Sequence, residues 1–206
     1  MVAADRDSPD VDPVFKYGFN AAVGTSAETI WLQGGAYTWQ GSATTVSVTS
    51  SSADDDGDPA GTGANTVVVE GLDANYAAQS ETVELNGTTV VNTANTYLRV
   101  HRMYVATAGS GLTNAGVIYA AASGDTYTTP GEPDTATGIM TTIGAGEGQT
   151  LQCFYTVPAG YTAYMTSIMA GSADGTNATT IDLKTRAVGG AFRTKHKFVV
   201  FKSTDQ

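Results

Sequence analysis

Residues 81–92 read Glu-Thr-Val-Glu-Leu-Asn-Gly-Thr-Thr-Val-Val-Asn, and they give the clearest local indication of the fold. Asn-Gly favours the two positive-φ positions of a type I′ turn, which joins antiparallel strands. We therefore expect a tight β-hairpin with residues 81–85 and 88–92 as its arms and Asn86-Gly87 as its turn.

The same two-residue alternation continues on both sides of this stretch, from about residue 29 to residue 201. Val46 and Val48, for example, alternate with Thr and Ser, as in a half-buried strand. Turn residues interrupt the alternation at regular intervals, and helical periodicity is lacking. The pattern predicts an all-β fold, an antiparallel β-sandwich of the jelly-roll kind with about ten to twelve short strands. Besides the hairpin arms, the expected strands include residues 29–32, 36–40, 45–49, 67–69, 97–105, 117–121, 125–128, 151–157, 161–169, 181–185 and 198–201.

The strand expected at residues 97–105 changes phase. Leu98 and Val100 share one face, but Met103 and Val105 have the opposite parity. One extra residue in a strand shifts all later side chains to the other face. We therefore expect a β-bulge near His101-Arg102.

The chain divides into an arm and a body. Residues 1–14 contain four aspartates and two prolines without an apolar period, so we expect an extended N-terminal arm that is ordered by docking on a partner. Residues 15–206 show no break in composition and are expected to form a single β-sandwich domain.

Charge and apolar content argue against two classes of partner. Residues 1–95 hold 13 acidic and 2 basic side chains, and residues 96–206 hold 7 acidic and 8 basic ones. An acidic surface repels phosphate backbones, so we expect no nucleic-acid partner. The sequence lacks an apolar run of the length of a membrane span and the blocks of a secretory signal, so we expect a soluble protein with no membrane partner.

The loop Asp54-Asp55-Asp56-Gly57-Asp58 is the one metal-like cluster in the sequence. Asp54, Asp56 and Asp58 stand at alternate positions and could supply oxygen ligands to calcium. The EF-hand spacing is not met, because the sixth position is Pro59 and not glycine. A solvated acidic loop tip is the alternative, and apart from this calcium hypothesis we expect no cofactor.

Residues for catalysis are scarce. His101 and His196 are the two histidines, neither stands in a nucleophile motif, and we expect both to be structural or interfacial. Cys153 lies in an apolar row and is expected to be an inert core residue. We therefore expect no enzyme. Tyr37 and Trp39 share one face of an expected strand, which favours a core over a sugar-stacking platform.

Several strand and turn segments together resemble a type of virion structural protein of marine tailed bacteriophages. They are residues 61–73, 81–88, 97–100, 146–150, 156–160 and 193–196, and the resemblance extends over about residues 15–200. The resemblance implies a non-enzymatic β-sandwich component of the phage particle, made in the host cytoplasm and located in the virion.

We expect a capsid surface accessory, or decoration (cement), subunit that acts through protein–protein contacts. Its expected partners are further copies of itself in a symmetric homo-oligomer, and the major capsid protein or other virion subunits. A tail, neck or fibre-base subunit is the first alternative. A carbohydrate- or receptor-binding module that uses Trp and Tyr side chains with the Asp54–Asp58 loop is the second.

Overall fold

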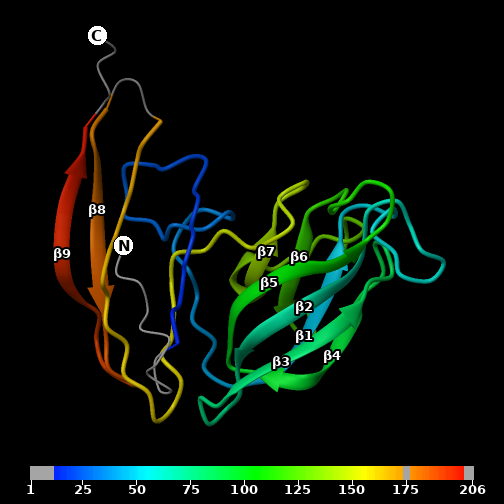
Figure 1. The fold of residues 1–206 in the computed structure, drawn as a ribbon, viewed down its shortest axis with the longest axis horizontal. Coiled ribbons are helices and arrows are strands. Elements are labelled where there is room, and N and C mark those ends of the chain that lie inside the picture. The colour runs from blue at the N-terminus through cyan, green and yellow to red at the C-terminus, as the bar shows by residue number, and fades with distance from the viewer. Residues whose placement is uncertain (1–11, 174–176, 202–206) are drawn as a thin grey trace. The chain divides into compact units, whose positions relative to one another are not determined.

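The computed structural model describes residues 12–173 and 177–201. It is an all-β structure with antiparallel pairing, as the sequence predicts (Figure 1). The strands are β1 (Thr44–Ser50), β2 (Ala64–Leu72), β3 (Ala78–Glu84), β4 (Val91–Tyr97), β5 (Arg99–Ala108), β6 (Ile118–Ala122), β7 (Ile139–Ile143), β8 (Thr179–Thr185) and β9 (Arg193–Val200). A single 3-10 turn, η1 (Ala136–Gly138), is the helical element of this described part, which has no helix suited to crossing a membrane.

The described residues form two compact units. Residues 12–163 make the first unit and contain β1 to β7, whereas residues 164–173 and 177–201 make the second and contain β8 and β9. Two compact units can still fold together as one domain, so the single domain over residues 15–206 stays a prediction. Most of the expected arm, residues 1–11, lies outside the described residues; residues 12–14 are exposed.

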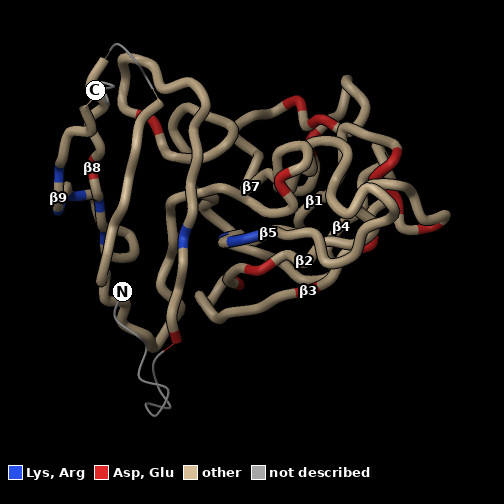
Figure 2. The backbone as a smooth tube through the Cα atoms, turned by 45° about the horizontal axis from the view of Figure 1, so that its top comes forward, with Lys and Arg blue, Asp and Glu red and all other residues tan. Residues whose placement is uncertain are grey.

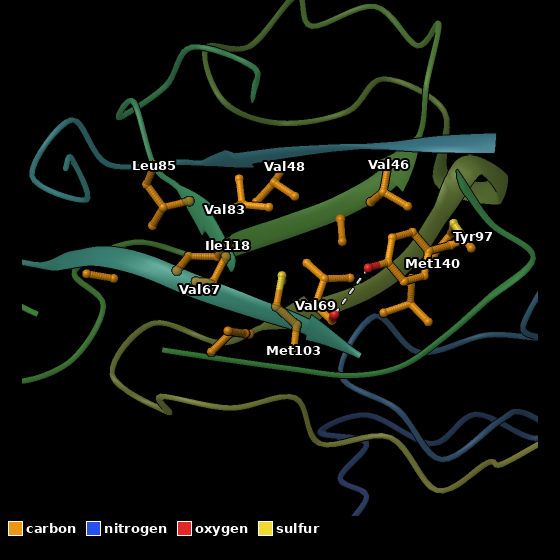
Figure 3. Packing of buried hydrophobic residues seen from close by; sticks show 14 residues of the cluster. Val46, Val48, Val67, Val69, Val83, Leu85, Tyr97, Met103, Ile118 and Met140 are labelled. Atoms are coloured by element: carbon orange, nitrogen blue, oxygen red, sulfur yellow. Dashed lines mark hydrogen bonds between the residues drawn. The ribbon is translucent and has the colours of Figure 1, made fainter. Parts of the chain in front are cut away.

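The first unit is a sandwich of two sheets with strand orders β4-β1-β6-β7 and β3-β2-β5. One core cluster takes side chains from both sheets, such as Val46 of β1, Val69 of β2 and Met140 of β7, all fully buried (Figure 3). Full burial of one such side chain contributes about 1.5–3 kcal/mol to the free energy of folding. Inside the core the Tyr97 hydroxyl donates to the Val69 carbonyl at 3.4 Å. The seven strands of this unit leave the jelly-roll topology a prediction.

An aromatic cluster forms a second, smaller core. Tyr37 is buried against Trp31 and Trp39, with ring centroids 5.0 Å away in each case, and against Phe154 at 4.1 Å. The Tyr37 hydroxyl donates to the Met140 carbonyl at 3.2 Å. Tyr37 and Trp39 therefore pack in the interior, as the sequence favoured.

The bulge expected in β5 is confirmed. Glu70 of β2 pairs with Arg102, but the next residue, Gly71, pairs with Val100, so His101 is the extra residue. The strand passes very close to β2 here, because a Cβ on Gly71 would lie 1.9 Å from the Arg99 carbonyl oxygen. The phase change in the sequence of β5 and the glycine at position 71 of β2 therefore lie at the same place, where the two strands approach each other at the bulge.

The hairpin expected at residues 81–92 is wrong in its pairing. Asn86 and Gly87 do form a turn, with Thr89 N–H donating to the Asn86 carbonyl at 2.9 Å. However, β3 pairs with β2 and β4 pairs with β1, so the turn carries the chain from one sheet to the other. Gly87 has φ 54°, whereas Asn86 is not among the described non-glycine residues with positive φ, so a type I′ turn does not form.

The structure has nine strands in its described part, fewer than the ten to twelve expected. Residues 29–32, 36–40, 125–128, 151–157 and 161–169 contain no strand and run as loops or extended chain, held at most by isolated bridges such as Trp31 to Gln152. Alternation alone does not supply a neighbouring strand with free N–H and C=O groups, and without one a ladder cannot form.

Candidate interaction surfaces

The acidic loop at residues 50–63 is organised around Asp55, which is fully buried. Its Oδ1 accepts the backbone N–H groups of Ala64 and Ala115, both at 2.7 Å. Its Oδ2 accepts the Ser50 hydroxyl at 2.6 Å and the Gly116 N–H at 2.9 Å. Four donors satisfy one carboxylate, so Asp55 is a structural anchor that joins the loop to residues 115–116.

Asp54, Asp56 and Asp58 flank this anchor. Asp54 and Asp58 are exposed, and Asp56 Oδ1 accepts the Asp58 N–H at 3.1 Å in a local turn. Within the described ranges, histidine, cysteine and acidic side chains nowhere gather in a group of three suited to a metal ion. Calcium binding by these three aspartates therefore stays a prediction.

A row of exposed aromatic side chains lies on the extended N-terminal segment of the first unit. Phe15, Tyr17 and Phe19 are 73%, 62% and 51% exposed and alternate with Lys16 and Gly18. Alternate residues of an extended chain point to opposite sides, so these three rings share one side. This aromatic row was not among the predicted sites, although the alternation over residues 15–19 indicates it in the sequence.

The other side of this segment packs on the chain near residue 153. A Cβ on Gly18 would lie 2.5 Å from the Cβ of Cys153, and Phe19 N–H donates to the Leu151 carbonyl at 3.5 Å. Cys153 itself is exposed, so its expected place in a core row is wrong, whereas Gln152 is buried. At residues 151–155 the even-numbered side chains face inward. Gln152 donates to the Val100 carbonyl, and Phe154 packs against the aromatic cluster.

Lys16 is half-buried beside a groove of about 670 Å³. Its ammonium donates to the His101 carbonyl. Loss of hydration lowers the pKa of Lys16 to about 8, and the positive charge of Arg102 acts in the same direction. The groove also has Tyr17, Glu70 and Tyr155 among its lining residues, so aromatic and charged groups border the same space.

The two histidines lie in different units. His101 is buried, its Nε2 accepts the Thr156 N–H at 3.2 Å, and its ring centroid lies 4.4 Å from that of Tyr155. Burial lowers the pKa of His101 to about 3, helped by the charges of Lys16 and Arg99. His101 therefore serves as a neutral interior acceptor, whereas His196 is exposed on β9.

The β8–β9 hairpin is the sheet of the second unit, and none of its strand residues is buried. Ile181 pairs with Phe198 and Leu183 with His196 on one face. Asp182 pairs with Lys197 on the other face, where the two charged groups lie 3.2 Å apart.

Charge is divided between the two units (Figure 2). Residues 12–163 hold 3 basic and 14 acidic side chains, a formal charge of −11. Residues 164–173 and 177–201 hold 5 basic side chains and 1 acidic one, a formal charge of +4. Arg99 and Arg102 lie in the less acidic half of the sequence but belong to the acidic unit of the structure.

Comparisons of the chain with protein-family models, with curated proteins and with solved structures gave no match. The case for a function therefore depends on the described surfaces: the aromatic row, the groove beside Lys16, the acidic loop and the basic hairpin.

Proposed function

We propose that this chain is a non-enzymatic structural protein of a phage virion, a capsid surface accessory or decoration subunit that acts through protein–protein contacts. The observation that carries its mode of action is the row of Phe15, Tyr17 and Phe19, which is exposed on a segment where Phe19 N–H donates to the Leu151 carbonyl and the Lys16 ammonium donates to the His101 carbonyl. The placement in a phage particle has separate support, the resemblance of the strand and turn segments described above.

Aromatic side chains are the residues most enriched in the buried centres of protein interfaces. Three of them on one side of an extended chain expose apolar area that a partner can cover at small cost in conformational entropy, because the segment is already ordered. Stable contacts bury about 800 Å² per partner. The aromatic row and its surroundings are suited to contribute part of such an area.

The test is gold labelling of phage particles with an antibody to this chain. Label distributed over the heads supports the decoration subunit. Label confined to one vertex or to the tail supports the neck, tail or fibre-base subunit. Particles that carry no label, even after disruption, contradict a virion protein of either kind.

Variants then test the aromatic row itself. Tyr17→Ser with Phe19→Ser is expected to reduce occupancy on particles at least tenfold. Tyr161→Ser is the matched control, because Tyr161 is 68% exposed but lies outside the row. Equal loss with the control would show that the row is not the contact. A chain that begins at Phe15 tests the arm separately, and full occupancy without residues 1–14 contradicts a docking arm.

A carbohydrate-binding module is the second candidate, and the groove beside Lys16 favours it. Tyr17 and Tyr155 line it together with Gln79 and Gln149, an aromatic and polar lining of the kind that sugar sites use. Tyr37 and Trp39 do not serve as a platform for a sugar, because both side chains belong to the aromatic core, as the sequence favoured. A glycan array gives the answer: specific binding that is lost in Tyr17→Ser supports the module, and a blank array contradicts it.

A further inference from the structure

The basic side chains of the sandwich unit lie close to one groove. Residues 12–163 contain three of them, Lys16, Arg99 and Arg102, against 14 acidic side chains. Lys16 and Arg102 line the groove of about 670 Å³ described above, and the charge of Arg99 acts on His101 in its lining. Positive charge in this strongly acidic unit is therefore concentrated around a space that a ligand can enter.

The Lys16 ammonium borders this groove without a counter-ion. An ammonium has three N–H donors, and Lys16 donates one of them to the His101 carbonyl. Lys16 takes part in none of the ion pairs formed among the described residues. Loss of hydration lowers the pKa of Lys16 to about 8, so the group is still charged at pH 7 but has lost much of its water. An anion in the groove would replace that water, because a partly buried charge is stabilised by a partner of opposite sign.

The charged groups of the lining limit the charge of such a ligand. Arg102 Nη1 lies 3.8 Å from Glu70 Oε2, Arg102 Nη2 donates to Gln149 Oε1 at 3.2 Å, and the guanidinium lies over the Tyr104 ring at 4.3 Å. Arg102 is therefore already engaged on three sides. The two positive charges of Lys16 and Arg102 and the negative charge of Glu70 leave a formal charge of +1 in the lining. A single carboxylate matches this charge better than a phosphate monoester, which carries about −1.5 to −2 at pH 7.

The rest of the polar lining is uncharged. His101 is neutral, because burial lowers its pKa to about 3. Gln79, Ser80 and Gln149 contribute amide and hydroxyl groups, and Tyr155 is half-buried beside His101, with ring centroids 4.4 Å apart. Amide, hydroxyl and aromatic groups of this kind suit a ligand rich in hydroxyl groups. A ligand that combines many hydroxyl groups with one carboxylate is an acidic saccharide.

We propose that the groove beside Lys16 binds a saccharide that carries a carboxylate, such as a uronate or a sialate, and that the Lys16 ammonium pairs with this carboxylate. Glu70 and Arg102 hold each other in the same lining, so the preference for an acidic sugar depends on Lys16. The inference rests on the carbohydrate-binding candidate of the previous section and names its class of sugar.

A glycan array that presents carboxylated saccharides beside neutral ones, probed at pH 7 with the full chain, is the first measurement. We expect binding to carboxylated members and none to their neutral counterparts. Binding to neutral saccharides alone overturns the proposal but supports a carbohydrate-binding module. A blank array overturns both, so the two failures are distinguishable.

Calorimetry with the acidic saccharide that binds best then measures the ion pair. The methyl ester of this saccharide keeps the ring and removes the negative charge, and it should bind the wild type at least tenfold more weakly than the acid. Lys16→Met should lose at least tenfold in affinity for the acid and bind the ester as the wild type does. Lys184→Met is the matched control, because it removes an exposed ammonium outside the groove lining and should leave both affinities unchanged.

The acid and its ester separate a charge effect from a structural one. Equal weakening of both ligands in Lys16→Met would show that Lys16 only shapes the groove, and it overturns the proposal. The comparison of the two ligands on the wild type needs no variant, and equal affinities there overturn the proposal as well.

A peptide with the sequence of residues 1–11, which contains three aspartates, tests another source of carboxylates. We expect no binding of this peptide. Binding of the peptide that is lost in Lys16→Met, without binding of any acidic saccharide, would identify the N-terminal arm of the chain as the occupant and overturn the proposal.

Discussion

The Asp55 carboxylate accepts the backbone N–H of Gly116 at 2.9 Å, across 61 residues of sequence. This hydrogen bond and the one from the Ala115 N–H connect the acidic loop to the segment that leads into β6 (Ile118–Ala122), and two more, from Ser50 and Ala64, fasten the carboxylate to the two ends of the loop. The most buried acid of the loop therefore maintains the fold, and the neighbouring acids form its charged surface.

Asp55→Asn is expected to destabilise the protein by about 2–5 kcal/mol. The amide nitrogen would place a donor against donors, and each buried N–H left without an acceptor costs about 1–3 kcal/mol. The measurement is urea denaturation followed by circular dichroism. Asp54→Asn, the same change on the exposed neighbour, should shift stability by less than about 0.5 kcal/mol. Equal effects of the two substitutions would contradict the anchor.

Gly71→Ala tests the bulge at His101. The new Cβ would lie 1.9 Å from the Arg99 carbonyl oxygen, so β2 and β5 must separate. We expect a loss of about 1–3 kcal/mol or more, as for overpacked interiors. Gly41→Ala serves as the control, because a Cβ there meets nothing within 4 Å. A melting temperature that changes equally in both variants would show that β2 and β5 leave room for a Cβ at residue 71.

Lys16→Met tests the half-buried ammonium through pH. Because burial lowers the pKa of Lys16 to about 8 from 10.5, the folded state disfavours the proton that the unfolded state binds. The wild type is therefore penalised fully below about pH 8, and the penalty disappears as pH rises through 10.5.

We expect Lys16→Met to be more stable than wild type at neutral pH and the difference to shrink between pH 8 and 10.5. The His101 carbonyl keeps a donor in the variant, because Gln152 Nε2 also donates to it at 2.9 Å. Parallel stability curves of the two proteins over this range would contradict the lowered pKa.

Tyr37→Phe removes one hydroxyl from the aromatic cluster and leaves the ring contacts in place. The buried Met140 carbonyl loses the donor that lies 3.2 Å away, so we expect a loss of about 1 kcal/mol. Tyr17→Phe removes a hydroxyl from an exposed ring and should be neutral in the same thermal unfolding experiment. Equal stability of Tyr37→Phe and wild type would indicate that water replaces the hydroxyl.

The sequence predicted the direction of strand side chains correctly where its alternation agrees with the pairing of the strands in the sheet. Val46 and Val48 lie buried in β1 as their alternation predicts, and the opposite parities of Val100 and Met103 placed the bulge at His101. The strand is not the half-buried one expected, however, because Ser47 and Thr49 on its other face are buried as well. In both places the pleat of a strand fixes which side each residue faces, so sequence spacing alone carries the information.

Other features depended on partners far away in the sequence. Asn86-Gly87 determined a turn, but only the placement of β1 and β2 decided that the arms of this turn enter different sheets. At residues 151–155 the expected core row was Leu151, Cys153 and Tyr155, yet Gln152 and Phe154 face inward, because the aromatic cluster and the carbonyls of Val100 and His101 lie on that side.

The sequence by itself determined the all-β class, the turn positions and the unequal distribution of charge, because each follows from residues near one another in the chain. Only the tertiary structure decided which acid of the 50–63 loop is buried. Asp55 differs from Asp54 and Asp56 solely in the four donors that the fold brings to it, from Ser50, Ala64, Ala115 and Gly116. A carboxylate leaves water only where such donors replace its hydration, and the chain order does not show where they meet.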